Sequence, residues 1–521
     1  MSGRRSLMIV GGVQISPIDG ERGVFIKSGS TVISSAMKMT GATVSSGQSQ
    51  YIYSRGVAAG GTIGISGRAY ISNGGLMSAS LVSGGITFQE AGDVYILSGG
   101  TAIDMYASTR GYLYCSSNGT LVSPEVLPGA NMYVFAGGVV ISPIFNGGNA
   151  TLSSGATGVS GVVYSGQYTA RGNISATVLS GGGVIVIDGG MAEDTVVSSG
   201  SLLRTSSAGV ASRVIVEWRG RSIVYPGGVD SVVTVESGGE LAIAGGIASQ
   251  TTVLSGGSMI VSSGGVAYNT TAVNGGRMFV YSGATINNTS ASEYADGFAV
   301  SASGAVVSGL DAWNASAFLS NCVAENISAG TDLGQYNARV SCYGGTVTNA
   351  TAGPNTLVGF NSGCSAMGTA TVGSKAYMPI DGNSYVENLV ALTGCICSAA
   401  RCTINNLILS GGAPTLSNEV MLNSITTTDV RGTIQLTGSS SIDGYAVSGY
   451  NVALYNGALC SNLTITDDGR CIVYNGGRLI SPTINSGGSL TINSGGTALA
   501  VTSQTGATVT VLEGGYIEYV E

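Results

Sequence analysis

The sequence predicts an all-β fold, a right-handed parallel β-helix (solenoid) with about 19 residues per coil. Three observations predict it: glycine doublets at regular spacing, short apolar runs in fixed register between them, and no segment with the pattern of an amphipathic helix. A fixed period of this size is typical of solenoids, in which each repeat forms one coil that stacks on the next. The right hand is expected because parallel crossover connections almost always take it.

The glycine doublets set the period. Steps of about eight residues alternate with steps of eleven, which together give nineteen and two turns per repeat. The doublets, with the Ser-Gly and Thr-Gly pairs that continue them, lie at Gly227, Gly238, Gly245, Gly256, Gly264, Gly275 and Ser282-Gly283, and again at Gly476, Gly487, Gly495, Thr505-Gly506 and Gly514-Gly515.

Glycine is expected at these turns because it enters the positive-φ region without steric cost. The polar residue before the doublet can hydrogen-bond the turn backbone, as is typical of Ser and Asn. These residues are Ser237, Ser255, Asn274, Asn475 and Ser486. Phosphate-binding loops are excluded because no helix follows the glycines.

Between the turns, apolar residues recur two apart in short runs rich in Val, Ile and Thr, which is the pattern of strands. Equivalent positions hold Leu241, Met259 and Met278, then Ile243, Val261 and Val280, and near the far end Leu490 with Val509 and Ile492 with Val511. Nineteen residues at ~3.3 Å give a perimeter of roughly 60 Å, enough for two or three strands per coil. The whole sequence would supply about 27 such coils.

Composition excludes several classes of function. The 521 residues include 84 glycines, 20 basic and 28 acidic residues, and no histidine. A Ser-His-Asp triad and a histidine-bound metal are therefore impossible. The net charge of −8 argues against nucleic acid and anionic membranes as partners. No apolar run reaches the ~18 residues of a membrane span, and no signal peptide is readable at Met1–Val10.

The repeat divides the chain into three parts: regular solenoid repeats over 1–284, degenerate or looped coils over 285–450, and regular repeats over 451–521. A separately inserted domain is the alternative for the middle part. Long loops on a rigid scaffold are where binding is expected, so the sequence places a ligand-facing surface in 285–450.

Eight of the nine cysteines lie in the last 200 residues: Cys322, Cys342, Cys364, Cys395, Cys397, Cys402, Cys460 and Cys471. The spacings of 20 and 22 between the first three approximate one coil, which favours an internal ladder of buried thiols. Disulfides and a metal site are the alternatives. A structural zinc on Cys395, Cys397 and Cys402 would lack a fourth ligand, so no metal or cofactor is predicted.

Few residues are candidates for chemistry, and we expect no enzyme and name no catalytic residue. Asp467-Asp468 is an adjacent acidic pair, as is Glu193-Asp194, but Asp-Asp-Gly before a strand reads as a turn. Tyr51 with Tyr53, and Tyr112 with Tyr114, have the spacing either to stack sugars on an outer face or to pack strands.

Segments such as Val253-Leu-Ser-Gly-Gly-Ser-Met-Ile-Val-Ser-Ser-Gly-Gly-Val-Ala267 and Leu490-Thr-Ile-Asn-Ser-Gly-Gly-Thr-Ala498 resemble the passenger repeats of AIDA-type autotransporter adhesins. The resemblance is clear over roughly 28–110, 137–283 and 455–515 and faint over 285–450. It implies a parallel β-helix on a bacterial surface that mediates adhesion, aggregation and biofilm formation, often with heptose attached to Ser or Thr. A repeat identifies architecture better than ligand.

The sequence thus favours an extracellular or cell-surface adhesive rod whose partners are host or bacterial surfaces and glycans. A second hypothesis is a filament that grows by end-to-end stacking of copies, because the repeat is read from Met8 to Val520 without a capping segment. A third is a carbohydrate-binding or carbohydrate-degrading phage tail spike.

Overall fold

We describe a computed structural model of the chain, which covers residues 8–10, 13–15, 22–85, 87, 90–292, 299–331, 338–428 and 431–520. These residues form 63 strands and no α-helix. The chain divides into two compact units, Met1–Ala242 with Gly246–Ala248, and Ile243–Gly245 with Ser249–Glu521. Each unit is a parallel β-solenoid, and the described residues make about 24 coils, with ~19 residues between stacked strands, so the predicted fold class is confirmed.

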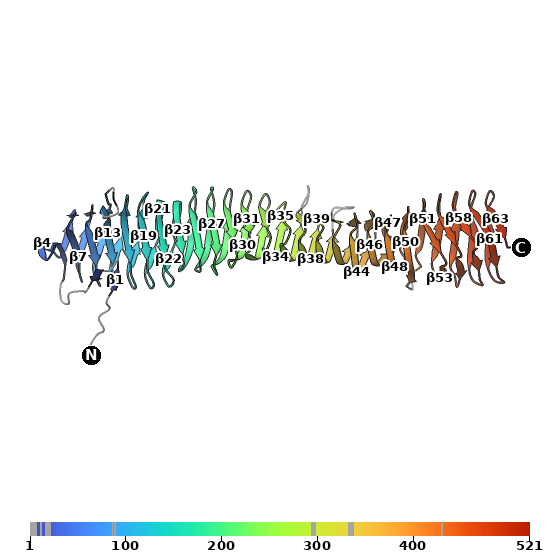
Figure 1. Cartoon of the computed structure of the whole chain (residues 1–521), viewed down its shortest axis with the longest axis horizontal. Coiled ribbons are helices and arrows are strands. Elements are labelled where there is room, and N and C mark those ends of the chain that lie inside the picture. The colour runs from blue at the N-terminus through green and yellow to red at the C-terminus, as the bar shows by residue number, and fades with distance from the viewer. Residues whose placement is uncertain are drawn as a thin grey trace, which may run out of the picture. The chain divides into compact units, whose positions relative to one another are not determined.

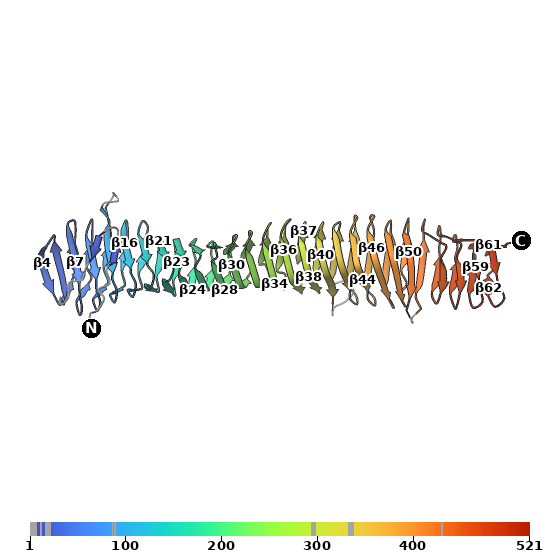
Figure 2. The same cartoon turned by 60° about the horizontal axis from the view of Figure 1, so that its bottom comes forward.

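Each coil has a first, a second and a third face, and in the coils near the N-terminal end each face has a strand of its own. In one coil these are β10 (Arg68–Ile71), β11 (Leu76–Ser78) and β12 (Leu81–Val82). Each pairs in parallel with its equivalent in the next coil: β13 (Gly92–Ile96), β14 (Thr101–Ile103) and β15 (Tyr106–Ala107). Figures 1 and 2 show how the strands of each unit follow one another in chain order.

First-face strands carry the aromatic side chains discussed below. Besides β10 and β13 they are β7 (Gln48–Ile52), β16 (Gly111–Cys115), β19 (Asn131–Val134), β25 (Val184–Asp188), β27 (Leu202–Ser206), β29 (Arg221–Val224), β31 (Glu240–Ile243), β33 (Ser258–Val261), β35 (Arg277–Val280), β37 (Val300–Ser303), β39 (Ser316–Ser320), β41 (Arg339–Tyr343), β43 (Leu357–Asn361), β45 (Tyr377–Ile380), β47 (Ile396–Ala400), β49 (Thr415–Ser417), β51 (Thr433–Thr437), β54 (Asn451–Leu454), β57 (Arg470–Val473), β60 (Ser489–Ile492) and β62 (Thr508–Val511).

Second-face strands are short where the corner after them is sharp. Besides β11 and β14 they are β5 (Lys38–Thr40), β8 (Val57–Ala59), β17 (Thr120–Val122), β20 (Val139–Ile141), β22 (Thr157–Val159), β52 (Ser441–Asp443), β55 (Leu459–Ser461), β58 (Arg478–Ile480) and β63 (Tyr516–Tyr519). The matching third-face strands, besides β12 and β15, are β6 (Thr43–Val44), β9 (Thr62–Ile63), β18 (Glu125–Val126), β53 (Ala446–Ser448), β56 (Thr464–Thr466) and β59 (Thr483–Ile484).

Elsewhere two faces share one long strand. The second and third faces are joined in β24 (Asn173–Leu179), β26 (Met191–Val197), β28 (Val210–Val216), β30 (Val229–Val235), β32 (Ile247–Val253), β34 (Val266–Val273), β36 (Thr285–Ser292), β38 (Val306–Trp313), β40 (Val323–Gly330), β42 (Thr346–Ala352), β44 (Ser365–Val372), β46 (Tyr385–Leu392), β48 (Thr403–Ser410), β50 (Met421–Thr427) and β61 (Thr497–Ser503). In β21 (Ile144–Leu152) and β23 (Val162–Ala170) a third-face strand runs on into the next first-face strand.

The predicted apolar register is confirmed inside the second unit. Met259 pairs with Met278 and Val261 with Val280 between β33 and β35. Between β60 and β62, Leu490 pairs with Val509 and Ile492 with Val511. Apolar side chains that point inward from the three faces form the core, and alternate residues point outward, as the strand period requires. The core thus runs inside the coils of each unit.

The predicted glycine turns are also confirmed. The first glycine of every doublet named above has a positive φ, for example +79° at Gly487 and +73° at Gly495. The second glycine is required for a different reason, since a methyl group at Gly496 would lie 2.6 Å from the carbonyl oxygen of Val473 in the preceding coil. One glycine permits the turn and the other permits close stacking.

The residue before the doublet also contacts the next coil. The side chain of Ser486 lies over the glycine of that coil, where a methyl group at Gly506 would meet Ser486 Oγ at 2.6 Å. Asn475 lies over Gly495 in the same way. These polar side chains therefore pack between successive turns.

Each coil has a third corner, which the sequence pattern does not predict. It is made by one residue with positive φ between the second and third faces, such as Ala79 (+47°), Asp104 (+50°) and Ser123 (+50°). Asn takes this position at Asn269 and Asn288, each with φ of +51°. Because the position accepts many residue types, no sequence motif marks it.

The N-terminal end differs from the prediction that the repeat begins at Met8. There β1 (Met8–Val10) and β2 (Val13–Ile15) pair with each other, antiparallel. Next, β3 (Val24–Ser28) pairs antiparallel with both β4 (Thr31–Ala36) and β7. An antiparallel hairpin therefore precedes the first regular coil, and this part of the prediction was wrong.

Over 285–450 the described residues keep the same three-face pairing. The coil length varies there, because Val306 pairs with Val323, 17 residues on, and Val323 pairs with Thr346, 23 residues on. This irregular spacing explains why the repeat is faint in the sequence. Residues 293–298, 332–337 and 429–430, where longer loops were expected, lie outside the described residues.

Candidate functional site

Five tyrosines form a continuous stack on the first face of the first unit: Tyr51, Tyr70, Tyr95, Tyr114 and Tyr133. They are paired residue to residue along successive strands. Their ring centroids lie 5.1, 5.1, 4.8 and 5.5 Å apart, with interplanar angles of 19° or less. The spacing follows directly from the ~4.8 Å distance between parallel strands.

This stack bears on the two roles that the sequence left open for the tyrosines, sugar stacking and strand packing. Tyr51 also stacks with Tyr53 at 6.1 Å, and Tyr112 with Tyr114 at 6.0 Å. The inner rings of the stack are covered on both faces by their neighbours, so only ring edges and hydroxyls remain for a ligand. The spacing serves strand packing here, and a sugar has no free ring face to lie on in the middle of the stack.

An ion pair lies beside the tyrosine stack. Arg68 Nε is 3.7 Å from Asp93 Oδ2, and the Tyr95 hydroxyl donates to the same oxygen at 3.4 Å. Burial raises the pKa of Asp93 above its usual value and outweighs the opposing effects of Arg68 and Tyr95. Burial also raises the pKa of Tyr95, with Asp93 adding to the effect. The Tyr95 hydroxyl therefore stays neutral at physiological pH.

A groove with a volume of about 610 Å³ lies in the second unit, along the turns that follow the first face. Successive coils place Tyr455, Tyr474, Asn493 and Leu512 at the same position, because each amide donates to a carbonyl of the coil before. Tyr455 and Tyr474 stack at 4.6 Å with an interplanar angle of 1°. The groove is lined by Tyr455, Asn456, Tyr474, Asn475, Asn493, Ser494, Leu512 and Glu513.

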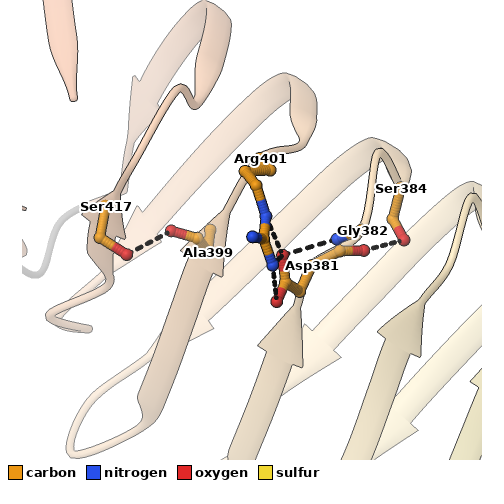
Figure 3. Close-up of polar contacts among 6 residues, drawn as sticks. All are labelled: Asp381, Gly382, Ser384, Ala399, Arg401 and Ser417. Carbon is orange, nitrogen blue, oxygen red and sulfur yellow. Dashed lines mark hydrogen bonds and ion pairs between the residues drawn. The ribbon is translucent and has the colours of Figure 1, made fainter. Parts of the chain in front are cut away.

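The same turn edge carries an ion pair in the middle segment (Figure 3). Arg401 donates from Nη2 to both carboxylate oxygens of Asp381, at 2.9 and 2.8 Å, and Asp381 also accepts from the amide of Gly382. Partial burial raises the pKa of Asp381, but these hydrogen bonds outweigh it and hold the pKa below its usual value. The pair links two turns across one coil and leaves both side chains largely exposed.

The nine cysteines are all free and buried. The predicted ladder is wrong in register, since Cys342 on β41 pairs with Phe360 on β43. Cys322 and Cys364 precede β40 and β44, and Gly345 holds that position in the coil between them. Cys342 does reach Cys364, and their hydrogen bond together with burial raises the pKa of Cys342. The thiols are thus core residues, as predicted, but they are not stacked on one another.

Burial also affects cysteines elsewhere in the core. It raises the pKa of Cys115, Cys402 and Cys460 to about 12. Within the described ranges, no group of three or more Cys, Asp or Glu residues could hold a metal ion. The metal alternative for Cys395, Cys397 and Cys402 therefore finds no ligand set.

The two adjacent acidic pairs take part in a turn and in ion pairs with arginine. Asp467 and Asp468 have φ of +46° and +64° and form a turn, as expected, and Asp468 is 3.8 Å from Arg431. Glu193 and Asp194 both contact Arg213. Arg213 lowers the pKa of Asp194 by hydrogen bonding. In the described part of the chain, no helix is long and apolar enough to cross a membrane.

The solved structures that resemble this chain include the following two. A crystal structure of a hyper-glycosylated TibA fragment, glycosylated by TibC, is 26% identical, covers 57% of this chain and 97% of the fragment, and has a TM-score of 0.43. A mutant of AlyGC, a PL6-family alginate lyase, is 8% identical, covers 88% of this chain and 97% of the lyase, and has a TM-score of 0.18. No family model and no curated protein matches the chain. The parallel β-solenoid implied by the AIDA-type repeats is the fold that the structure has.

Proposed function

We propose that the protein is an extracellular, non-enzymatic adhesin that acts at cell surfaces. The observation that supports this function most is the parallel solenoid, in which equivalent outward-facing residues of successive coils lie ~4.8 Å apart. A stiff scaffold that presents many similar weak contacts gains avidity, because each contact after the first is effectively intramolecular. The resemblance of the repeats to AIDA-type passengers supports the same function.

Adhesion can be tested with beads that carry the purified protein. We expect the beads to bind bacterial or epithelial cells about a hundredfold better than beads whose protein was denatured before coupling, as multivalency would give. Equal retention by native and denatured protein would refute an adhesive role for the solenoid. Added soluble protein should compete with the beads.

The absence of enzymatic activity has a separate test. The acidic pairs lie in a turn and around Arg213, which supports a structural role for them. Incubation with bacterial capsular polysaccharides should release no reducing sugar. Release that is lost in Asp467→Asn would establish the tail-spike hypothesis instead.

A head-to-tail filament is the second candidate. Strands β62 and β63 expose Val511, Tyr516 and Tyr519, each at least 40% accessible. Against it, β3 runs antiparallel to both β4 and β7, so the parallel ladder is interrupted at this end. Negative-stain microscopy should show particles of one length, and fibres of variable length would favour the filament.

A further inference from the structure

The groove in the second unit contains an aromatic face that no ring covers. Tyr455 stacks on one face of Tyr474, because two parallel rings whose centroids lie only 4.6 Å apart must lie face to face. The other face of Tyr474 points to the next coil, where the equivalent residue is Asn493. This differs from Tyr114, whose ring lies between those of Tyr95 and Tyr133.

The space beyond Tyr474 has the width of one saturated ring. Leu512, 47% exposed, holds the equivalent position two coils after Tyr474, which places the two backbones about 10 Å apart. A ring that contacts both side chains needs about 4 to 4.5 Å on each side. Asn493 lies between them, and its side chain turns to the backbone carbonyl of Val473, so it forms the floor.

Polar groups of the following turns line the same space. The amide nitrogen of Asn493 donates to the carbonyl of Val473 at 3.5 Å, which fixes its orientation. Asn475 turns Oδ1 toward Gly495, so its amino group is the part that a ligand can reach. Ser494 adds a hydroxyl and Glu513 a carboxylate. Donors and acceptors therefore surround one apolar face.

We propose that this groove binds a neutral pyranose of a glycan, with an apolar face of the sugar on Tyr474 and its hydroxyls on Asn475, Asn493 and Glu513. An aromatic face with convergent amides and a carboxylate suits a ring that is apolar on its faces and polar at its rim. Uronic and sialic acids are disfavoured because Glu513 is the only charged residue of the lining. The proposal goes beyond the adhesive function and does not depend on it.

The test uses the full-length protein and a panel of oligosaccharides that end in neutral hexoses, N-acetylhexosamines or uronic acids, with binding measured by saturation-transfer NMR and calorimetry. Tyr474→Ala should weaken binding about tenfold or more, and Tyr474→Phe should change it less than about threefold. Tyr114→Ala is the matched control, because it removes an equivalent ring that is covered on both faces, and it should leave binding unchanged.

Asn493→Tyr is the decisive variant. It extends the stack by one ring, as in the first unit, so it covers the free face of Tyr474 while the fold is kept, and it should abolish binding. Absence of neutral-sugar binding at millimolar concentration, unchanged binding in Asn493→Tyr, or preference for uronic acids would each overturn the proposal. Failure here leaves the cell-binding assay unaffected, and a protein that binds sugars but no cells would refute only the adhesive function.

Discussion

At the scale of residues, the two glycines of a doublet have different tasks. Gly487 has φ of +79°, and a methyl group there would make only ordinary van der Waals contacts, the nearest at 3.7 Å, whereas a methyl group at Gly488 would collide with the carbonyl of Ile465 in the coil before. A left-handed backbone costs a residue with a Cβ roughly 1–2 kcal/mol, and Asn tolerates it better than Ala. A backbone collision cannot be relieved without moving a neighbouring coil.

We therefore predict an order of destabilisation in which Gly488→Ala exceeds Gly487→Ala, and Gly487→Asn costs least. Thermal unfolding and hydrogen exchange of residues 465–492 measure it. The order would be contradicted if Gly488→Ala were as mild as Gly487→Asn, because the second glycine would then be dispensable for stacking.

Asp230 is a fully buried carboxylate in the core of the first unit. Its Oδ2 accepts from Ser222 Oγ at 2.9 Å, and its in-register neighbour on β28 is Ala211. Burial raises the pKa of Asp230 to about 6 from 3.8, against the opposing effect of the Thr205 and Ser222 hydroxyls. Ionisation of this group therefore opposes folding.

The sign of the pH dependence follows from the raised pKa. The folded state binds the proton more tightly, so the stability that Asp230 contributes is complete below pH 3.8 and is lost as the pH rises to about 6. The loss amounts to about 3 kcal/mol. Asp230→Asn should remove this slope from unfolding curves recorded between pH 4 and 7, and a wild-type slope in the variant would place its origin elsewhere.

At the scale of elements, the corner between the second and third faces decides which substitutions stabilise. Val232 on β30 holds this corner with φ of +53° and is 45% exposed. A β-branched residue is strained in this region, whereas Asn takes it at Asn269 and Asn288.

Val232→Asn should therefore raise the free energy of unfolding by about 1 kcal/mol. Val306→Asn is the control, since Val306 is a comparably exposed strand valine, at 43%, without a positive φ. That variant should be neutral or destabilising, as Asn is a poor strand former. A gain in both variants would mean that polarity, and not the backbone, sets the effect.

How far the sequence predicts the elements depends on the kind of signal. The repeat predicts the glycine turns and the pairing of Met259 with Met278, because the turn positions require glycine and the core positions require apolar side chains. The corner at Ala79 or Ser123 cannot be recognised in the sequence, because many residue types occupy it. The hairpin β3–β4 cannot be recognised either, because it depends on which strands pair and not on a residue type. The groove at Tyr474 was missed because it depends on the absence of a third stacked ring, which only the coil register reveals.

At the scale of the whole molecule, the protein buries its apolar side chains inside a series of repeated coils instead of in a globular core. With 9% charged residues and a net charge of −8, its surface offers mainly hydroxyls, amides and ring edges. Such a surface suits weak, repeated contacts with glycans more than steering of charged partners.

The central claim is that the chain stacks one coil on the next in parallel, in the register stated. Dipolar spectroscopy with spin labels attached by thiol-sparing chemistry tests it most directly at Thr491 and Thr510, which pair between β60 and β62. Strong coupling is expected for this pair, from backbones about 4.8 Å apart, and about twice that separation for Ile472 with Thr510, two coils apart. Separations beyond about 20 Å for Thr491 and Thr510 would contradict the parallel solenoid.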